Sequence, residues 1–593
     1  MLTHGVPADR VGPRWAPLPS LAVVATLLVV GFLVGGDLWF FSDDWNIFAG
    51  YHSGNLLEPF NGHLSLVPAG SYQAIFQTLG VGSYMPFRLV GLAALGVLGY
   101  QVCRTSVRAG GWVVGMLATT AVIWNSSGET NVLFPFLLNF SLPLAALLGC
   151  WWNLGGVAPN TSPATAGTRD VGPGEPDGPV LRRRAIAMGL WLALALATSG
   201  LGVVVAVALA VELAGRRAPR AVWIAWATPV LLWTTWWLGH RSASNLSLDP
   251  TVVLPYAARM VLAGATALGA GVHALGLLVL AALAAALTWG IASRRVGLPR
   301  LAAALCALAA FCGLTAMTRQ DTVVPVPPDE LRYGWTVGAL LVFSALALLD
   351  GPVAPADGGG RSGSASSFRE GVPGRVPALG AVVVASCVLL GGAVVLAGGM
   401  RDWAGAVHGA APGLRSNIYA AEALGADRVP PDAVLGPLSY VPVNAREYLG
   451  GVEDVGSPLQ GSTVEMIGGR PEQRAEADRF FFDNVGIREP TPLGADAGIH
   501  GPQCASQLEA LPGARIVLTH ATTGSAEGGG AAGSEGGTLR AGVSRFDPAL
   551  AALQVTSRGP GLLEIPRDAV VGTTAVVPYR LTAGPDAVLC PYR

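Results

Sequence analysis

Charged residues are scarce in this chain of 593 residues, at only 13% of the total. A soluble globular protein has about 25%, so the low charge excludes a soluble fold for most of the length. Lysine is absent, and arginine carries the basic charge. The net charge of −1 lacks the basic excess of a nucleic-acid-binding protein, and we expect no nucleic-acid partner.

Several motifs are also missing. None of the seven cysteines forms a CxxC pair, and most fall in or beside apolar runs, where cysteine behaves as a small hydrophobic residue. There is no GxxxxGK[ST] phosphate-binding loop, and the glycine run at 269–276 has no strand before it. These absences exclude an ATP-driven pump and a dinucleotide-binding site of the Rossmann type.

What the sequence does contain is long apolar runs, since hydrophobic residues make up 51% of it. A transmembrane helix needs about 20 apolar residues, and runs near that length predict an α-helical polytopic membrane protein with about eleven spans. We expect the first run to be a retained anchor, because no small-x-small cleavage site precedes Asp37. The predicted spans are 19–37, 86–103, 111–125, 133–152, 184–198, 200–214, 221–239, 273–291, 300–317, 333–349 and 376–398.

The arginines set the orientation, because cytoplasmic loops carry the basic excess. With eleven spans the arginine clusters fall on one side, which predicts a plasma-membrane protein with a cytoplasmic N-terminus and an extracytoplasmic C-terminus. Segment 252–270 is apolar but contains Arg259, and we expect it to be a helix at the outer interface. Segment 63–80 is similar and too polar for a lipid-facing span. The loops 153–180 and 351–375 are rich in Gly, Pro and Ser and are predicted to be disordered linkers.

The sequence changes character after residue 398. Residues 399–593 are polar enough to lie outside the membrane, and their last part alternates short β-type runs with turns, which is typical of a β-sandwich or jelly roll. We therefore predict a polytopic membrane domain over 1–398, with its first outer loop at 38–85, and an extracytoplasmic β-rich domain after it. Because the outer side is oxidising, we expect Cys504 and Cys590 to form a disulfide rather than two free thiols.

The stretch FFSDDWNIFAG places two carboxylates, Asp43 and Asp44, where the first span ends. Aromatic residues flank the pair on both sides, as in an interfacial belt. Carboxylates and imidazoles at a water–lipid boundary can act as general bases or hold a divalent cation. The alternative is that the two acids only solvate the start of a loop. The same loop gathers further polar side chains, namely His52, Glu58, Asn61 and His63.

DDW followed by EPFNGH, in a long first outer loop, resembles the pattern of a bacterial subgroup of the GT-C superfamily of membrane glycosyltransferases. The resemblance covers about residues 15–400 and implies an enzyme that takes a sugar from a polyprenyl-phosphate carrier. It makes Asp43 or Asp44 the base that deprotonates the acceptor hydroxyl. The other acid would orient the acceptor or bind a cation such as Mg²⁺, Mn²⁺ or Ca²⁺. Glu58 and His63 would position the acceptor.

A departing phosphate needs positive charge, and the predicted outer loop 318–333 offers it. Arg319 and Arg332 lie at the two ends of this loop, and the chain re-enters the membrane at Tyr333. Arginine matches phosphate oxygens with paired hydrogen bonds, so we expect these three residues to bind the donor. The alternative is that Arg332 extends to the interface or pairs with a neighbouring acid.

These residues together predict a GT-C-like glycosyltransferase that moves a sugar from a polyprenyl-phosphate donor to a glycan, lipid or protein acceptor of the cell envelope. By fold-level analogy the C-terminal domain would hold the acceptor as a carbohydrate-binding module. A flippase for lipid-linked glycans is one alternative, and it predicts ionisable residues buried in mid-span, of which there are few. A non-catalytic scaffold whose outer domain binds partners is the other, and it predicts no cavity behind the acid pair.

Overall fold

The chain forms two compact units, and each is described by itself. Unit 1 comprises Met1–Leu38, Asn55–Ala74 and Met85–Gly405, and unit 2 comprises Trp39–Gly54, Ile75–Tyr84 and Ala406–Arg593. The computed structural model describes residues 17–51, 55–60, 62–155, 178–240, 247–292, 297–319, 326–349, 375–426, 429–430, 433–435, 444–459, 471–485, 490–492, 504–510, 514–520, 538–544, 553–558, 560–565, 579–585 and 587–591. The predicted linkers lie almost wholly outside these ranges.

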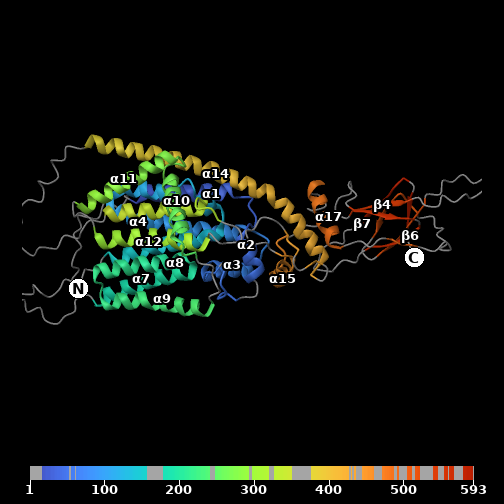
Figure 1. Ribbon diagram of the computed structural model, residues 1–593, viewed down its shortest axis with the longest axis horizontal. Coiled ribbons are helices and arrows are strands. Elements are labelled where there is room, and N and C mark those ends of the chain that lie inside the picture. Colours follow the sequence, from blue (N-terminus) through green and yellow to red (C-terminus); the bar gives the residue numbers. More distant parts are fainter. Residues whose placement is uncertain are drawn as a thin grey trace, which may run out of the picture. The chain divides into compact units, whose positions relative to one another are not determined.

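Unit 1 is a bundle of helices (Figure 1). Two helices, α3 (Leu66–Leu79) and α14 (Arg375–Leu424), contribute residues to both units. The other helices of unit 1 are α1 (Leu18–Val34), α4 (Met85–Ile123), α5 (Glu129–Leu133), η2 (Pro135–Leu137), α6 (Leu138–Leu154), α7 (Gly178–Thr198), α8 (Leu201–Arg216), α9 (Arg220–His240), α10 (Pro250–Leu268), α11 (His273–Ala292), α12 (Leu298–Arg319) and α13 (Leu331–Leu349).

Seven helices in the described part of the chain are long and apolar enough to cross a membrane, which is compatible with a multi-pass membrane protein. They are Met85–Ile123, Pro135–Leu154, Pro250–Leu268, His273–Ala292, Leu298–Arg319, Leu331–Leu349 and Val382–Leu424. Helices also cover most of each of the other ranges in which the sequence predicts spans, namely 19–37, 184–198, 200–214 and 221–239. The helical fold of this part is therefore confirmed, whereas the number of about eleven spans stays a prediction.

One of the seven, α10, includes most of the segment 252–270 that the sequence predicts to lie at the interface. Its length and composition would allow it to span. In Figure 1, however, α10 crosses the direction of the neighbouring helices of the bundle. A helix in the plane of the interface would have this orientation, and the interfacial position stays a prediction.

A pair of glycines divides α4 into the two helical segments that the sequence predicts. Gly110 and Gly111 have non-helical backbone angles, and φ of Gly111 is +79°. A residue with a side chain is strained at such an angle, whereas glycine adopts it readily. The chain turns here, so the predicted spans 86–103 and 111–125 meet at this corner.

Glycines also let the helices of unit 1 approach closely. A Cβ added to Gly99 of α4 would lie 2.6 Å from Val24 of α1, and one added to Gly189 of α7 would lie 2.8 Å from the carbonyl oxygen of Ala225 in α9. Small residues at such crossings are typical of membrane helices, whose association depends on close van der Waals contact.

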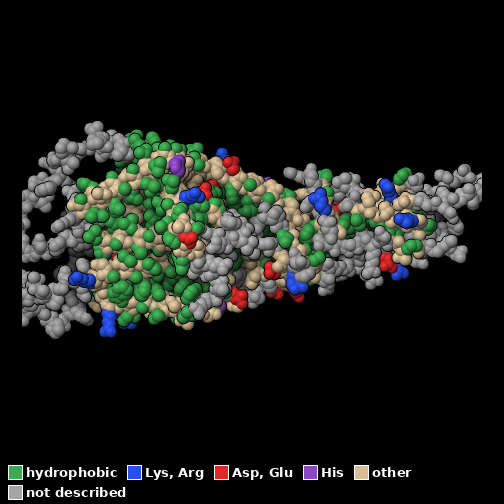
Figure 2. Space-filling model, viewed as in Figure 1, with side chains coloured by type: hydrophobic (Ala, Val, Ile, Leu, Met, Phe, Trp, Pro, Cys, Tyr) green, Lys and Arg blue, Asp and Glu red, His purple; other side chains and the backbone are tan. Residues whose placement is uncertain are grey.

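The outward side chains of this bundle are apolar. On α11, Leu278 and Trp289 are each 63% exposed. Hydrophobic side chains cover most of the visible face of the helical part in Figure 2. A hydrophobic surface this broad is stable against lipid and would aggregate in water, which agrees with the membrane assignment.

Unit 2 combines helices with two small sheets. Its α2 (Asp43–Tyr51) packs against α15 (Ala445–Val455), where the missing side chain of Gly451 admits the ring of Phe48. The Tyr448 hydroxyl of α15 donates a 2.6 Å hydrogen bond to the carboxylate of Glu422 in α14. The unit also contains α17 (Pro471–Val485). The helix α2 is thus held by a second helix of its own unit.

In the described part of unit 2, eight strands form two four-stranded antiparallel sheets, in the orders β1-β6-β3-β8 and β2-β7-β4-β5. Strands β3 and β8 of one sheet contact β4 and β7 of the other, as the layers of a sandwich do. The predicted β-rich region is therefore confirmed. The strands are β1 (Thr491–Pro492), β2 (Gln507–Ala510), β3 (Arg515–His520), β4 (Leu539–Ser544), β5 (Leu553–Ser557), β6 (Gly561–Glu564), β7 (Tyr579–Ala583) and β8 (Ala587–Pro591).

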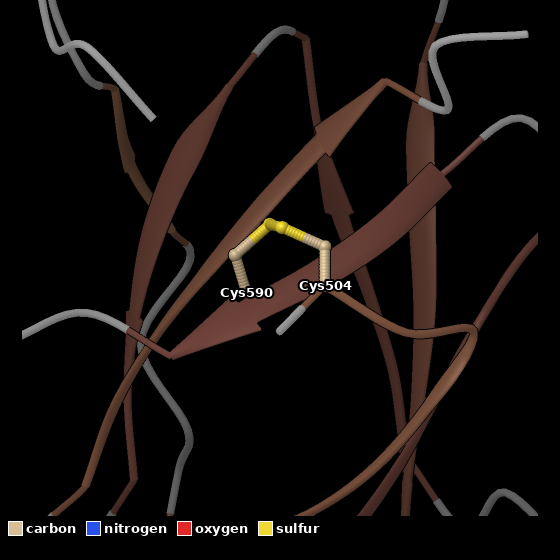
Figure 3. Close-up of a disulfide and its surroundings, with 2 residues drawn as sticks. All are labelled: Cys504 and Cys590. Carbon is tan, nitrogen blue, oxygen red and sulfur yellow. A yellow bond between two sulfur atoms is a disulfide. The ribbon is translucent and has the colours of Figure 1, made fainter. Parts of the chain in front are cut away.

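The predicted disulfide is present between Cys504 and Cys590 (Figure 3). Beside it, Ala505 and Leu589 exchange two backbone hydrogen bonds of 2.9 and 3.0 Å. Leu589 and Cys590 belong to β8, whereas the segment that starts at Cys504 continues into β2 of the other sheet. The disulfide therefore joins the two layers of the sandwich.

Candidate functional site

The acid pair opens α2 in unit 2. Asp43 and Asp44 occupy the first turn of this helix, where the positive end of the helix dipole favours carboxylates. Both side chains are buried, Asp44 completely. One oxygen of Asp44, Oδ2, accepts a hydrogen bond from the backbone N–H of Phe41 at 3.0 Å and another from the hydroxyl of Tyr84 at 2.5 Å. These donors offset the burial of Asp44 and fix its orientation.

The aromatic residues around the pair form a buried cluster. The indole N–H of Trp45 donates to the carbonyl oxygen of Phe40 at 3.1 Å, and the rings of Trp39 and Trp45 lie 5.0 Å apart. Arg415 of α14 stacks over Trp39 at 4.5 Å. All three of these aromatic side chains are less than 8% exposed, so they form part of the core of unit 2 and are not a simple belt of exposed rings.

The sequence also predicts a divalent cation at the acid pair. A divalent cation in a protein takes several oxygen or nitrogen ligands. Among the described residues no group of three or more His, Cys, Asp or Glu side chains could hold a metal ion. Oδ2 of Asp44 faces two hydrogen-bond donors, which would repel a cation. The expected Mg²⁺, Mn²⁺ or Ca²⁺ at the pair therefore stays a prediction.

In unit 1, His63 lies at a tight turn. Phe60 and His63 exchange two backbone hydrogen bonds of 2.9 and 3.0 Å, and Gly62 between them has φ of +77°. The imidazole lies against Gly200 at the α7–α8 corner, where a Cβ would come within 2.8 Å of Nδ1. Burial, and then the positive charge of Arg319, lowers the pKa of His63 to about 4. The imidazole is therefore neutral at pH 7 and can both donate and accept hydrogen bonds.

The predicted donor-binding residues come together in the same unit. Arg319 ends α12, and Arg332 lies in the first turn of α13. Both arginines, with Glu330 and Tyr333, lie within electrostatic reach of Tyr256 in α10. The guanidinium of Arg332 lies 5.5 Å from the centre of the Tyr333 ring, and its Nε lies 3.8 Å from the Glu330 carboxylate. The predicted pairing with a neighbouring acid is therefore present as well, as a long contact.

The rest of the predicted first-loop set is less well defined. Glu58 is exposed, and its carboxylate accepts a hydrogen bond from the Asn55 side chain at 2.9 Å. His52 and Asn61 lie outside the described residues. The role of Glu58 in positioning the acceptor stays a prediction.

Sequence reasoning missed a buried acid in the loop between α4 and α6 of unit 1. Glu129 begins α5 and is 8% exposed, and burial raises its pKa. Its Oε2, and both polar side-chain atoms of Asn131, are buried without a hydrogen-bond partner in the part of the chain that the structure describes. Ser127 of this loop packs against Gly334, two residues after Arg332. Only the polar stretch NSSGETN between two apolar runs could have indicated it.

The candidate residues thus form two groups. Unit 2 contributes the acid pair Asp43 and Asp44, and unit 1 contributes His63, Arg319 and Arg332 with Tyr333 beside them. The first group can accept a proton, and the second can bind an anionic oxygen and donate hydrogen bonds to it. No protein-family model, curated protein or solved structure matches this chain.

Proposed function

We propose that this protein is an integral membrane glycosyltransferase that takes a sugar from a polyprenyl-phosphate-linked donor. One observation carries the proposal: Arg319 and Arg332 gather with a neutral histidine, His63, at one end of a bundle of apolar helices. A lipid-linked sugar has a chain that dissolves in the bilayer and a phosphate at the membrane surface. A bundle with a basic end offers a surface for both parts.

In this proposal the two acids have different roles. Asp44 is a positioning residue, because its Oδ2 is engaged by Tyr84 and by the backbone of Phe41. Asp43, which precedes it on the same turn of α2, is the general base. A carboxylate that is partly desolvated is a stronger base than one in water, which suits the removal of a proton from a hydroxyl group.

The proposed reaction is a single displacement at the anomeric carbon of the sugar. A general base takes the proton of the acceptor hydroxyl, and the acceptor oxygen forms a bond to the anomeric carbon. The bond from that carbon to the phosphate oxygen breaks, and polyprenyl phosphate departs with the electron pair. Arg319 and Arg332 stabilise the negative charge that grows on the phosphate. The acceptor is a glycan, lipid or protein of the cell envelope on the outer face of a bacterial plasma membrane.

The β-sandwich suits a role in holding the acceptor. Its two packed sheets recur in many binding modules, including those for carbohydrates, so this role rests on fold analogy alone. The buried pair of Glu212 and Arg300 in unit 1 lies at helix ends rather than in mid-span, and we find no feature that favours the flippase over the transferase.

Binding of the donor phosphate is the direct test of the basic group. We would measure the affinity of the purified protein for a fluorescent short-chain polyprenyl phosphate. A hydrogen bond to a charged group contributes about 1.5–3 kcal/mol, so Arg332→Gln and Arg319→Gln should each weaken binding by about tenfold or more. Arg332→Lys keeps the charge but loses the paired geometry and should give an intermediate affinity.

The matched control is Arg220→Gln, because Arg220 is an exposed arginine at the start of α9. It should leave the affinity unchanged. Equal affinities for the unmodified protein and both arginine variants would contradict the proposed donor site. Equal weakening by Arg220→Gln would show that the effect is one of overall charge.

A further inference from the structure

A second basic site lies in unit 1, away from Arg319. It is a recess with a cavity volume of about 20 Å³, partly open to the outside, whose polar lining includes Arg108 of α4, Trp151 of α6 and Arg300 of α12. Arg300 and Arg319 are 19 residues apart on the same helix, which corresponds to about 28 Å along its axis. This length is close to the hydrocarbon thickness of a bilayer, about 30 Å. The recess therefore lies near the opposite membrane surface, on the side of the arginine-rich loops.

Two buried hydrogen-bond donors in this recess have no partner. The indole N–H of Trp151, in a side chain 1% exposed, makes no hydrogen bond in the part of the chain that the structure describes, and neither does the hydroxyl of Thr105. Both residues line the recess. A buried unpaired donor costs about 1–3 kcal/mol, and such a group calls for an explanation by a ligand or a water molecule.

The charge around the recess is strongly positive. Arg300 Nε lies 3.2 Å from the carboxylate of Glu212, which also pairs with Arg216 at 2.8 Å. The guanidinium of Arg300 donates to the carbonyl oxygen of Trp151 at 3.0 Å. Arg104 and Arg108 add two more guanidinium groups, which lie 4.3 and 5.2 Å from the ring of Trp152. The four arginines and the one acid, Glu212, give the surroundings of the recess a net charge of +3.

The ligand that matches this recess is a phosphate group. The two unpaired groups that line the recess, the Trp151 N–H and the Thr105 hydroxyl, can both donate to an anion. The net charge is positive, and arginine pairs with phosphate oxygens. Trp152 is 37% exposed, as is usual for a tryptophan at the level of the headgroups. Leu346 and Ala347 line the same recess and offer an apolar wall for an acyl chain. Basic pockets between membrane helices at the cytoplasmic surface bind anionic headgroups in this way.

We infer that this recess binds the phosphate of an anionic lipid in the leaflet that faces the arginine-rich loops. The bound phosphate accepts hydrogen bonds from Trp151 and Thr105 and pairs with Arg108. It joins α4, α6, α12 and α13 at the membrane surface. This inference does not depend on the proposed glycosyltransferase activity.

The test is lipid binding and thermal stability of the purified full-length protein in detergent. Titration with phosphatidylglycerol should raise the unfolding temperature and leave lipid bound in native mass spectra, whereas phosphatidylcholine should do neither. One arginine near a membrane surface contributes about 1 kcal/mol, or about fivefold in affinity. Arg108→Gln should therefore weaken phosphatidylglycerol binding by about fivefold. Trp151→Phe, which removes only the N–H donor, should weaken it by a similar factor.

The control variant is again Arg220→Gln, an arginine outside the recess. It should bind phosphatidylglycerol like the unmodified protein. Equal binding of phosphatidylglycerol and phosphatidylcholine, or full binding by Arg108→Gln and Trp151→Phe, would overturn the inference. Parallel titrations with inorganic phosphate and glycerol 1-phosphate, at matched ionic strength, distinguish the source. Stabilisation by these soluble compounds equal to that by the lipid would overturn the assignment to a lipid.

Discussion

Removal of the disulfide should destabilise the β-sandwich far more than the membrane bundle. Cys504 and Cys590 are separated by 86 residues, and the chain-entropy treatment of a loop of this length gives about 4.6 kcal/mol. Measured losses for native disulfides are usually smaller, about 2–4 kcal/mol. The two backbone hydrogen bonds between Ala505 and Leu589 remain when the sulfurs are removed, and we therefore expect about 2–4 kcal/mol.

The assay is urea-dependent proteolysis of the full-length protein in detergent, which follows cleavage within the C-terminal domain. With a urea dependence of about 1–3 kcal/mol per molar, the midpoint for the double variant Cys504→Ser, Cys590→Ser should fall by about 0.7–4 M. Cys387→Ser is the control, because Cys387 is an exposed free thiol in α14, and it should leave the midpoint unchanged. An equal midpoint for the double variant and the unmodified protein would refute the role of the disulfide as the link between the sheets.

Three further predictions concern the candidate site. Tyr84→Phe removes a hydrogen-bond donor from the buried Asp44 and should lower the free energy of unfolding by about 1.5–3 kcal/mol. The same proteolysis assay measures this change, and an unchanged midpoint would contradict the prediction. Gly200→Ala places a Cβ against the ring of His63 and should lower the free energy of unfolding, measured by thermal unfolding, by about 1–3 kcal/mol. The control is Gly313→Ala, whose added Cβ meets no atom within 4 Å and should leave the stability unchanged or raise it. Because the pKa of His63 is lowered from 6.5 to about 4, its neutral form stabilises the fold above pH 6.5, and that contribution should be lost as the pH falls from 6.5 toward 4. His63→Gln should remove this part of the pH dependence, and a profile that does not change would count against a buried neutral imidazole.

Much of the fold could be predicted from the sequence, because apolar runs and turn residues are local signals. The β-type runs of the C-terminal region contain the strands β3 to β8, and these runs are 514–520, 538–546, 550–558, 561–566, 574–582 and 587–592. The short strands β1 and β2 were not predicted, because β1 has only two residues and the alternation in β2, QLEA, extends over only four. The disulfide was predictable from the compartment and from the presence of only two cysteines in the domain.

The grouping of the site residues could be predicted only in part. Arg319 and Arg332 could be predicted to lie near each other because they stand at the two ends of one loop, and the ends of a loop meet at the same end of the bundle. The contact of His63 with the α7–α8 corner joins residues more than a hundred positions apart, and no local pattern carries that information. The hydrogen-bonded environment of Asp44 depends on Tyr84, which the sequence does not link to it. Burial of Glu129 likewise depends on helices that are distant in the sequence.

The measurement that tests the central claim most directly is sugar transfer by the purified protein from a panel of labelled polyprenyl-phosphate sugars. We would compare the unmodified protein with Asp43→Asn, Asp44→Asn and the control Glu453→Gln, an exposed acid of α15. A general base contributes about 10²–10⁴-fold, so Asp43→Asn should lose transfer by at least about a hundredfold while it keeps its fold and its affinity for polyprenyl phosphate. Asp44→Asn should lower both stability and transfer, and Glu453→Gln should change neither. Equal transfer by all four proteins would contradict the assignment of the base, and no turnover of any donor would contradict the glycosyltransferase and favour the scaffold or the flippase.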